Sequence, residues 1–143
     1  MQTVTTVYPA GGQRENGAAS LRLVLLVTYG CNLACKYCCV LKELRGRKNM
    51  PEGMLRSAAD FLMTSSKRDL QLHFFGAEPL ILPFEAYARV LPYIRRRERE
   101  SGKRLDLLVT TNAALLDERW VELFKEHAVR LEISMDGDAD SHN

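Results

Sequence analysis

The sequence carries little net charge, no long apolar run and no cysteine outside one short segment. Its 20 Lys and Arg residues exceed its 18 Asp and Glu residues by two, so no overall field draws the chain toward nucleic acid or an anionic membrane. The longest apolar run near the start, Leu23 to Val27, is far shorter than the roughly 20 residues that cross a bilayer. The first twenty residues lack the basic start and apolar stretch of a secretory signal. We expect a cytoplasmic protein with no nucleic-acid partner and no membrane partner.

The four cysteines are confined to the segment from Cys31 to Cys39. Disulfides within so short a segment would close very small, strained loops, and reduced thiols agree with a reducing compartment. Cys31, Cys35 and Cys38 come directly after an apolar, strand-like run. Three clustered thiolates, rather than four, are typical of a metal centre that leaves one position open for a ligand. This spacing predicts a catalytic metal site more than a structural one.

Composition and hydrophobic patterning predict one packed domain. Hydrophobic residues make up 46% and charged residues 27% of the chain, as in ordinary globular proteins. Residues 1–20 form a polar N-terminal arm in this interpretation, and residues 21–143 form the core domain. The pattern predicts strands at 21–28, 69–75, 104–110 and 129–135, and helices at 51–62, 84–99 and 117–126. We expect the first strand to be buried on both faces, Pro92 to kink or split the second helix, and the charged run 95–100 to be a solvated helix face.

Strands that alternate with helices predict an α/β fold with a parallel sheet and helices on its outside. Polar segments follow each of the four predicted strands: the cysteine loop, 76–79, 110–112 and 134–137. In parallel α/β folds the active site lies at the carboxyl ends of the strands. These four segments are therefore expected to converge on one surface.

Four motifs occur in order along these segments: Cys31–Cys38 (CNLACKYC), Phe74–Leu80 (FFGAEPL), Thr111–Leu116 (TNAALL) and Ile133–His142 (ISMDGDADSH). Together they resemble the motifs of the radical S-adenosylmethionine (radical SAM) enzymes, and among these the sulfatase-maturase and peptide-modifying group. The resemblance implies the N-terminal portion of a partial (βα)6 barrel, with about four parallel strands and outer helices. It also implies a core domain that is truncated at the C-terminus, so that the last strand becomes an open edge.

By this resemblance, Cys31, Cys35 and Cys38 each ligate one iron of a 4Fe–4S cluster. The fourth iron is left open for S-adenosylmethionine (SAM), whose cleavage releases methionine and a 5′-deoxyadenosyl radical. Binding SAM against the cluster brings its sulfonium close enough to receive an electron. The implied enzyme modifies a peptide or protein side chain and takes its electrons from a donor such as flavodoxin or ferredoxin.

The same resemblance implies a set of residues that bind SAM. They are Tyr37, Gly76, Ala77, Glu78, Pro79, Thr111, Asn112, Ser134 and Asp136. The turn at 76–79 would hold the methionine ammonium group, because small residues let backbone carbonyls approach and Glu78 supplies an anionic acceptor. Side chains at 111, 112 and 134 would hydrogen-bond the SAM carboxylate or ribose, and Tyr37 would pack near the adenine. Ala77 stands where family members usually have a second glycine, which puts a positive φ at this position in question.

Other interpretations of the cysteines remain open. A structural zinc-binding module could use Cys39 or His73 as a fourth ligand, and Cys35 with Cys38 could form a thioredoxin-like redox pair. A catalytically incompetent fragment is a further alternative. We interpret Cys39 as a small buried residue rather than a ligand, and His73 as a core histidine whose hydrogen bonds are satisfied. Iron and sulfide content would separate the cluster from the zinc site.

Overall fold

Strands and helices alternate along the chain, as the sequence predicts. The computed structural model describes residues 3–7, 20–36, 38 and 49–135. In chain order the elements are β1 (Thr3–Val7), β2 (Leu21–Thr28), α1 (Glu52–Met63), β3 (Asp69–Gly76), the 3-10 helix η2 (Pro79–Ile81), α2 (Phe84–Ser101), β4 (Arg104–Thr111), α3 (Glu118–Glu126) and β5 (Val129–Met135). The bounds of β2 and β5 are those predicted, and the other predicted elements differ by at most two residues at either end.

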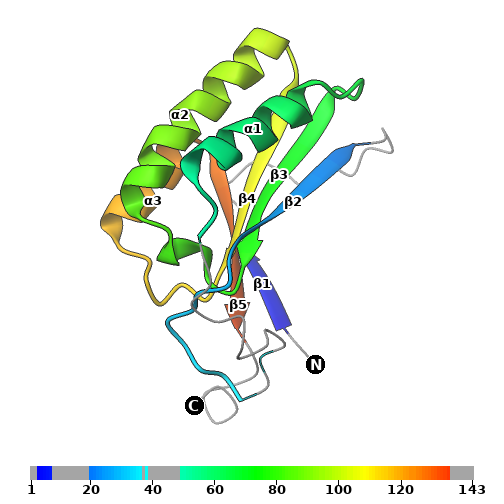
Figure 1. Ribbon diagram of the computed structural model, residues 1–143. Coiled ribbons are helices and arrows are strands. Elements are labelled where there is room, and N and C mark those ends of the chain that lie inside the picture. The colour runs from blue at the N-terminus through cyan, green and yellow to red at the C-terminus, as the bar shows by residue number, and fades with distance from the viewer. Residues whose placement is uncertain (1–2, 8–19, 37, 39–48, 136–143) are drawn as a thin grey trace.

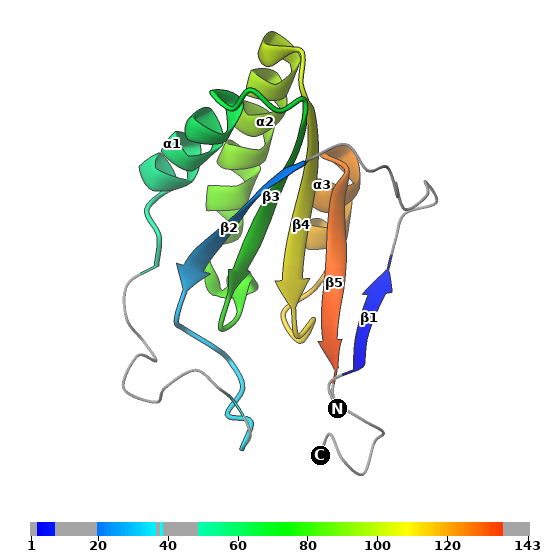
Figure 2. The same ribbon diagram turned by 90° about the vertical axis from the view of Figure 1, so that its right-hand side faces the viewer.

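The strands form one sheet in the order β1-β5-β4-β3-β2. Neighbours among β2, β3, β4 and β5 are parallel, while β1 runs antiparallel to β5. Figure 2 shows the arrowheads of the four parallel strands at the same end of the sheet. The register places Thr28 beside Gly76, and Thr111 beside Ile133, at that end. The predicted α/β fold with four parallel strands is confirmed.

The three described α-helices pack on one face of the sheet (Figures 1 and 2). Side chains from these helices and from alternate strand positions form one apolar core, in which Leu72, Phe74 and Leu107 are fully buried. Trp120 and Phe124 of α3 belong to the same core. Among the residues described, no helix has the length and apolar content that crossing a membrane requires.

β2 is not buried on both faces, which corrects the prediction. Leu25 and Val27 are buried in the core, whereas Val24 and Leu26 are 46% and 44% exposed. β2 is an edge strand, and the described helices cover one face of the sheet only. An apolar run therefore identified the strand, but it could not show which of its faces another element covers.

The structure adds two details on the helices. Helix α1 buries Leu55 and Leu62, but Met54 and Phe61 are 55% and 67% exposed because they project from a different side of the helix. Helix α2 runs through Pro92 as one helix of 18 residues, so Pro92 does not split it, and a kink at Pro92 stays a prediction. The apolar stripe of α1 is narrower than its composition suggests.

β1 covers the edge of β5 that the sequence analysis leaves open. Its residues pair in antiparallel register, from Thr3 opposite Met135 to Val7 opposite Leu131. The expectation of an open β5 edge is therefore wrong, because part of the N-terminal arm supplies the hydrogen-bond partner that an edge strand lacks. The signal for this strand was its run of β-branched residues, which favour extended backbone.

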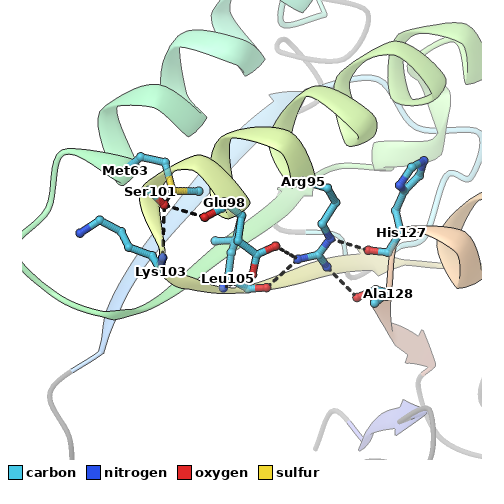
Figure 3. A network of polar contacts seen from close by, with 8 residues as sticks. All are labelled: Met63, Arg95, Glu98, Ser101, Lys103, Leu105, His127 and Ala128. Carbon is cyan, nitrogen blue, oxygen red and sulfur yellow. Dashed lines mark hydrogen bonds and ion pairs between the residues drawn. The ribbon is translucent and has the colours of Figure 1, made fainter.

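Arg95 ties α2 to β4 and to the end of α3 (Figure 3). Its guanidinium donates to the carbonyl oxygens of Leu105, His127 and Ala128 at 2.8, 2.8 and 3.1 Å, and it pairs with Glu98 at 2.6 Å. The Arg95 side chain is only 15% exposed. The expectation that the whole run 95–100 forms a solvated helix face is therefore wrong at Arg95. A guanidinium has five donors and can satisfy several carbonyls at a helix end together.

Replacing Arg95 with methionine should lower the free energy of unfolding by about 2–3 kcal/mol, because three carbonyl oxygens and the Glu98 carboxylate each lose one donor. Urea unfolding followed by circular dichroism measures this. Arg96→Met is the matched control: the Arg96 side chain is 59% exposed and its ion pair with Glu100 spans 3.7 Å, so a change within about 0.5 kcal/mol is expected. Equal losses in the two variants would contradict the anchoring role of Arg95.

Candidate functional site

Hydrogen bonds from Thr28 join the carboxyl ends of β2 and β3. Its backbone carbonyl accepts from the Ala77 N–H at 3.0 Å. Its hydroxyl accepts from the Gly30 N–H at 2.9 Å and donates to Asn49 Oδ1 at 2.7 Å. Thr28 is 1% exposed, so these contacts replace water at a buried polar group. Thr28 is not among the residues predicted from the sequence, where its signal is a polar side chain that ends an apolar strand directly before the cysteine loop.

Gly76 allows β3 to end close against β2. Its φ is +151°, and a Cβ at this position would lie 2.5 Å from the carbonyl oxygen of Thr28. Ala77 is not among the described non-glycine residues with positive φ. The turn therefore requires glycine at position 76 and accepts alanine at position 77, which answers the question raised by the missing second glycine.

Glu78 is fully buried, and its carboxylate accepts three hydrogen bonds from the protein. Oε1 accepts from the Leu80 N–H at 2.9 Å and from the Thr111 hydroxyl at 2.7 Å, and Oε2 accepts from the Asn112 N–H at 2.8 Å. The backbone N–H of Glu78 donates to the Gly30 carbonyl at 3.0 Å. A buried carboxylate needs such donors in place of water. Glu78 thereby fastens the end of β4 to the turn after β3 and to the start of the cysteine loop.

The Glu78 carboxylate faces the interior of the protein rather than the solvent at the carboxyl ends of the parallel strands. Burial and the nearby Glu78 carboxylate raise the pKa of Tyr87 well above its ordinary range, and the Tyr87 hydroxyl donates to the Pro79 carbonyl at 3.3 Å. Gly76 and Ala77 are only half-buried. A ligand at this edge would therefore meet the backbone at 76–77 first, and a contact between Glu78 and the SAM ammonium stays a prediction.

The three predicted metal ligands lie in the loop that follows β2 and extends past the carboxyl ends of the strands (Figure 2). Cys31, Cys35 and Cys38 are free thiols and are partly exposed. The Cys31 sulfur accepts from the Leu33 N–H at 3.4 Å and from Asn112 Nδ2 at 3.8 Å. The Cys38 N–H donates to the Cys35 carbonyl at 3.2 Å, which closes a turn between these two cysteines. Three free thiols, of which Cys31 accepts from two N–H groups, fit the ligand chemistry of an iron–sulfur cluster.

Asn112 is fixed by a turn at the end of β4. Its Oδ1 accepts from the Ala114 N–H at 2.9 Å, while the Ala113 N–H donates to Thr111 Oγ1 at 3.0 Å. Ala113 has a left-handed φ of +62°, which is uncommon for a residue other than glycine. The amide nitrogen of Asn112 is thereby directed at the cysteine loop, where it also donates to Asn32 Oδ1 at 3.0 Å. Both ends of the amide are occupied by protein atoms.

His73 does not contribute to this site. Its Nδ1 lies 2.6 Å from Arg22 Nη2 and its Nε2 lies 2.6 Å from Thr110 Oγ1. A guanidinium can only donate, so Nδ1 is the acceptor and Nε2 carries the proton that is donated to Thr110. Burial, and then the charges of Arg22 and Arg130, lower the pKa of His73 to about 4. The prediction of a satisfied histidine is confirmed, and a zinc site that uses His73 is not formed.

Within the described part of the chain, no three His, Cys, Asp or Glu side chains gather closely enough to hold a single metal ion. Cys39 lies outside the described residues, so its predicted role stays a prediction.

The structure brings most of the predicted site residues to one edge of the sheet. Hydrogen bonds connect the cysteine loop, the turn at 76–79 and the segment 111–112. Ser134 is exposed near the end of β5, one residue past the last pair between β4 and β5 and so level with Asn112. Tyr37 and Asp136 lie outside the described residues. The contacts of all these residues with SAM stay predictions.

The chain is similar to several known proteins. Residues 25–143 match the family described as the Radical SAM superfamily. The chain is 29% identical over 126 residues to a cysteine-type anaerobic sulfatase-maturating enzyme of Clostridium perfringens (strain 13 / Type A), which covers 85% of this chain and 34% of that enzyme. It is 25% identical over 119 residues to a serine-type anaerobic sulfatase-maturating enzyme of Bacteroides thetaiotaomicron, which covers 79% of this chain and 28% of that enzyme. The chain thus spans about a third of the length of these relatives.

Solved structures with the same fold include two of anSMEcpe. Native anSMEcpe with bound AdoMet, which is SAM, has a TM-score of 0.75 at 24% identity, and the match covers 87% of this chain and 34% of that chain. Native anSMEcpe with bound AdoMet and the Cp18Cys peptide has a TM-score of 0.72 at 25% identity, and covers 86% of this chain and 33% of that chain. These likenesses show that the α/β fold described here corresponds to about a third of those proteins.

Gly76→Ala should lower the free energy of unfolding by about 3 kcal/mol, because both the backbone conformation and the contact with the Thr28 carbonyl must be relieved. Ala77→Gly is the matched control, with an expected loss of only about 0.4–1 kcal/mol from greater freedom of the unfolded chain. Urea unfolding of the two variants measures the difference. A larger loss for Ala77→Gly than for Gly76→Ala would overturn the assignment of the glycine requirement.

Glu78→Gln should also destabilise the protein, by about 1–3 kcal/mol, because the amide NH2 group must face one of three donors that now bind oxygen. Amide hydrogen exchange should show faster exchange of the Asn112 N–H, which loses its acceptor. Glu85→Gln is the control, since Glu85 is exposed on α2 and should leave both measurements unchanged. Unaltered stability and exchange in Glu78→Gln would show that the carboxylate does not hold the strand ends together.

Proposed function

Because the chain belongs to the radical SAM superfamily, we propose that Cys31, Cys35 and Cys38 hold a 4Fe–4S cluster at the carboxyl end of the parallel sheet. The observation that carries this proposal is the contact between the Cys31 sulfur and Asn112. It places the first cysteine against the end of β4, while Gly30 joins the same loop to the turn after β3. The cysteine loop is therefore supported on the edge where parallel α/β folds bind their ligands.

Such a cluster, when bound, supplies the electron that cleaves SAM into methionine and a 5′-deoxyadenosyl radical. In this proposal, the backbone carbonyls of Gly76 and Ala77 accept hydrogen bonds from the methionine ammonium group, since small side chains allow a close approach. Glu78 and Thr111 support the site through their mutual hydrogen bond, which holds this turn and the end of β4 in place. Ser134, exposed at the adjacent end of β5, is proposed to hydrogen-bond the carboxylate or ribose of SAM.

A peptide or protein side chain is the proposed substrate. This is supported by the likeness to sulfatase-maturating enzymes and to a solved structure that holds a peptide. Because the chain spans about a third of those proteins, the support comes from likeness and not from a substrate contact. The reaction also needs electrons from a donor protein such as flavodoxin or ferredoxin, and free thiols suit a reducing, cytoplasmic setting.

Anaerobic reconstitution of the 143-residue chain with iron and sulfide should give about four irons per chain and a broad visible absorption. Cys31→Ala, Cys35→Ala and Cys38→Ala should each abolish this loading, because each removes one of three thiolate ligands. Iron and sulfide analysis measures the loading, and electron paramagnetic resonance of the reduced protein identifies the cluster type.

Cys39→Ala is the matched control and should load like the wild-type chain. Loss of the cluster in Cys39→Ala as well would contradict the ligand assignment. A single bound zinc without sulfide would overturn the proposed function in favour of a structural zinc-binding module. A loaded cluster that does not cleave SAM to 5′-deoxyadenosine would identify a catalytically incompetent fragment.

A further inference from the structure

We propose that Asn112 is a positioning residue for the Cys31 thiolate and that its side-chain amide raises the reduction potential of the cluster. This inference rests on the proposed function, because it concerns one of the three ligands. It also extends that function, since the motif resemblance assigns Asn112 to SAM and not to a cysteine sulfur.

Among the described residues, two N–H groups donate to the sulfur of Cys31. It accepts one N–H from within its own loop, that of Leu33 at 3.4 Å, and a second from Asn112 Nδ2 at 3.8 Å. Among the described residues, no N–H group donates to the sulfur of Cys35 or Cys38 within hydrogen-bond distance. The contact from Asn112 is also the only one of these that comes from another element of the fold.

The geometry of the Asn112 amide is imposed by its surroundings. The backbone N–H of Asn112 is held by Glu78 Oε2 at 2.8 Å, and its Oδ1 is held by the Ala114 N–H at 2.9 Å. Because Ala114 can only donate at this nitrogen, the oxygen of the amide is identified and the NH2 group is the end that faces the cysteine loop. Asn32 Oδ1, at 3.0 Å, accepts from the same nitrogen and keeps it beside Cys31.

Reduction of an iron–sulfur cluster adds negative charge that its thiolate ligands share. A hydrogen bond to a sulfur therefore stabilises the reduced cluster more than the oxidised one, and hydrogen bonds to the sulfurs are among the factors that set the potential. Because other contacts already hold the Asn112 amide in place, its hydrogen bond to the Cys31 sulfur costs little conformational entropy. Asn112 thus makes the cluster easier for an electron donor to reduce, and the same shift makes the reduced cluster a weaker reductant.

The test compares the midpoint potential of the loaded wild-type chain with that of Asn112→Asp, in the absence of SAM. Aspartate keeps the Oδ1 that accepts from Ala114 but replaces the donor to Cys31 with a negative oxygen. Reduction should become about tenfold less favourable, a fall of ~59 mV for a one-electron couple. Because SAM is absent, a lost contact between Asn112 and SAM cannot produce this shift.

Two further variants separate the hydrogen bond from simple charge. Ala114→Asp adds the same charge two residues away on an exposed position without removing a donor to sulfur, so it should shift the potential much less than Asn112→Asp. Asn112→Ala removes the donor without adding charge and should lower the potential by a smaller amount than Asn112→Asp. An unchanged potential in Asn112→Ala, or equal shifts in Asn112→Asp and Ala114→Asp, would overturn the inference.

If neither Asn112 variant loads a cluster, the wild-type chain provides the test of the hydrogen bond from Asn112 to Cys31. Electron–nuclear double resonance of its reduced cluster should then show a nitrogen coupling that changes when asparagine is labelled with 15N, and that persists in Asn32→Ala. Absence of that coupling in the loaded wild-type chain would overturn the role of Asn112. Failure of the wild-type chain to load iron and sulfide would instead overturn the proposed function, so the two failures are distinguishable.

Discussion

The buried carboxylate of Glu78 is the constraint on which the candidate site depends. A charged group without solvent costs several kcal/mol unless protein donors replace its water. Glu78 has no exposed surface, and its donors come from its own turn and from the end of β4. Burial is therefore favourable only when these segments meet in one arrangement. The same residue holds the Gly30 carbonyl through its backbone, so the cysteine loop begins from a fixed point.

This constraint divides the motif at 76–79 between two tasks. Gly76 and Ala77 form its half-buried side, where the absence of large side chains leaves the backbone approachable. Glu78 and Pro79 form its buried side, where Glu78 accepts a hydrogen bond from Thr111 and the Pro79 carbonyl accepts one from Tyr87. Residues that face a ligand are held close to their working geometry before the ligand binds when packed and hydrogen-bonded residues support them in this way. The hydrogen bond from Asn112 to the Cys31 sulfur supports the cysteine loop in the same manner.

Much of the architecture could be predicted from local patterns. Hydrophobic patterning located strands β2 to β5 and helices α1 to α3, because burial of one face is what stabilises such elements. The predictions from sequence failed for segments that are stabilised by partners distant in the chain. β1 is a polar, β-branched segment whose pairing partner lies in β5, and Arg95 is a charged residue whose acceptors lie in β4 and after α3. The exposure of one face of β2 likewise depends on what other elements cover.

The sequence by itself determined the order of β2 to β5 with α1 to α3 between them, and the three clustered thiols. These follow from periodicity and side-chain chemistry, which act over a few residues. Only the tertiary structure decided that the Glu78 carboxylate faces inward and that Asn112 reaches Cys31, a residue 81 positions away. The physical reason is that strand register, set by the packing of the whole sheet, chooses the partners of each polar group.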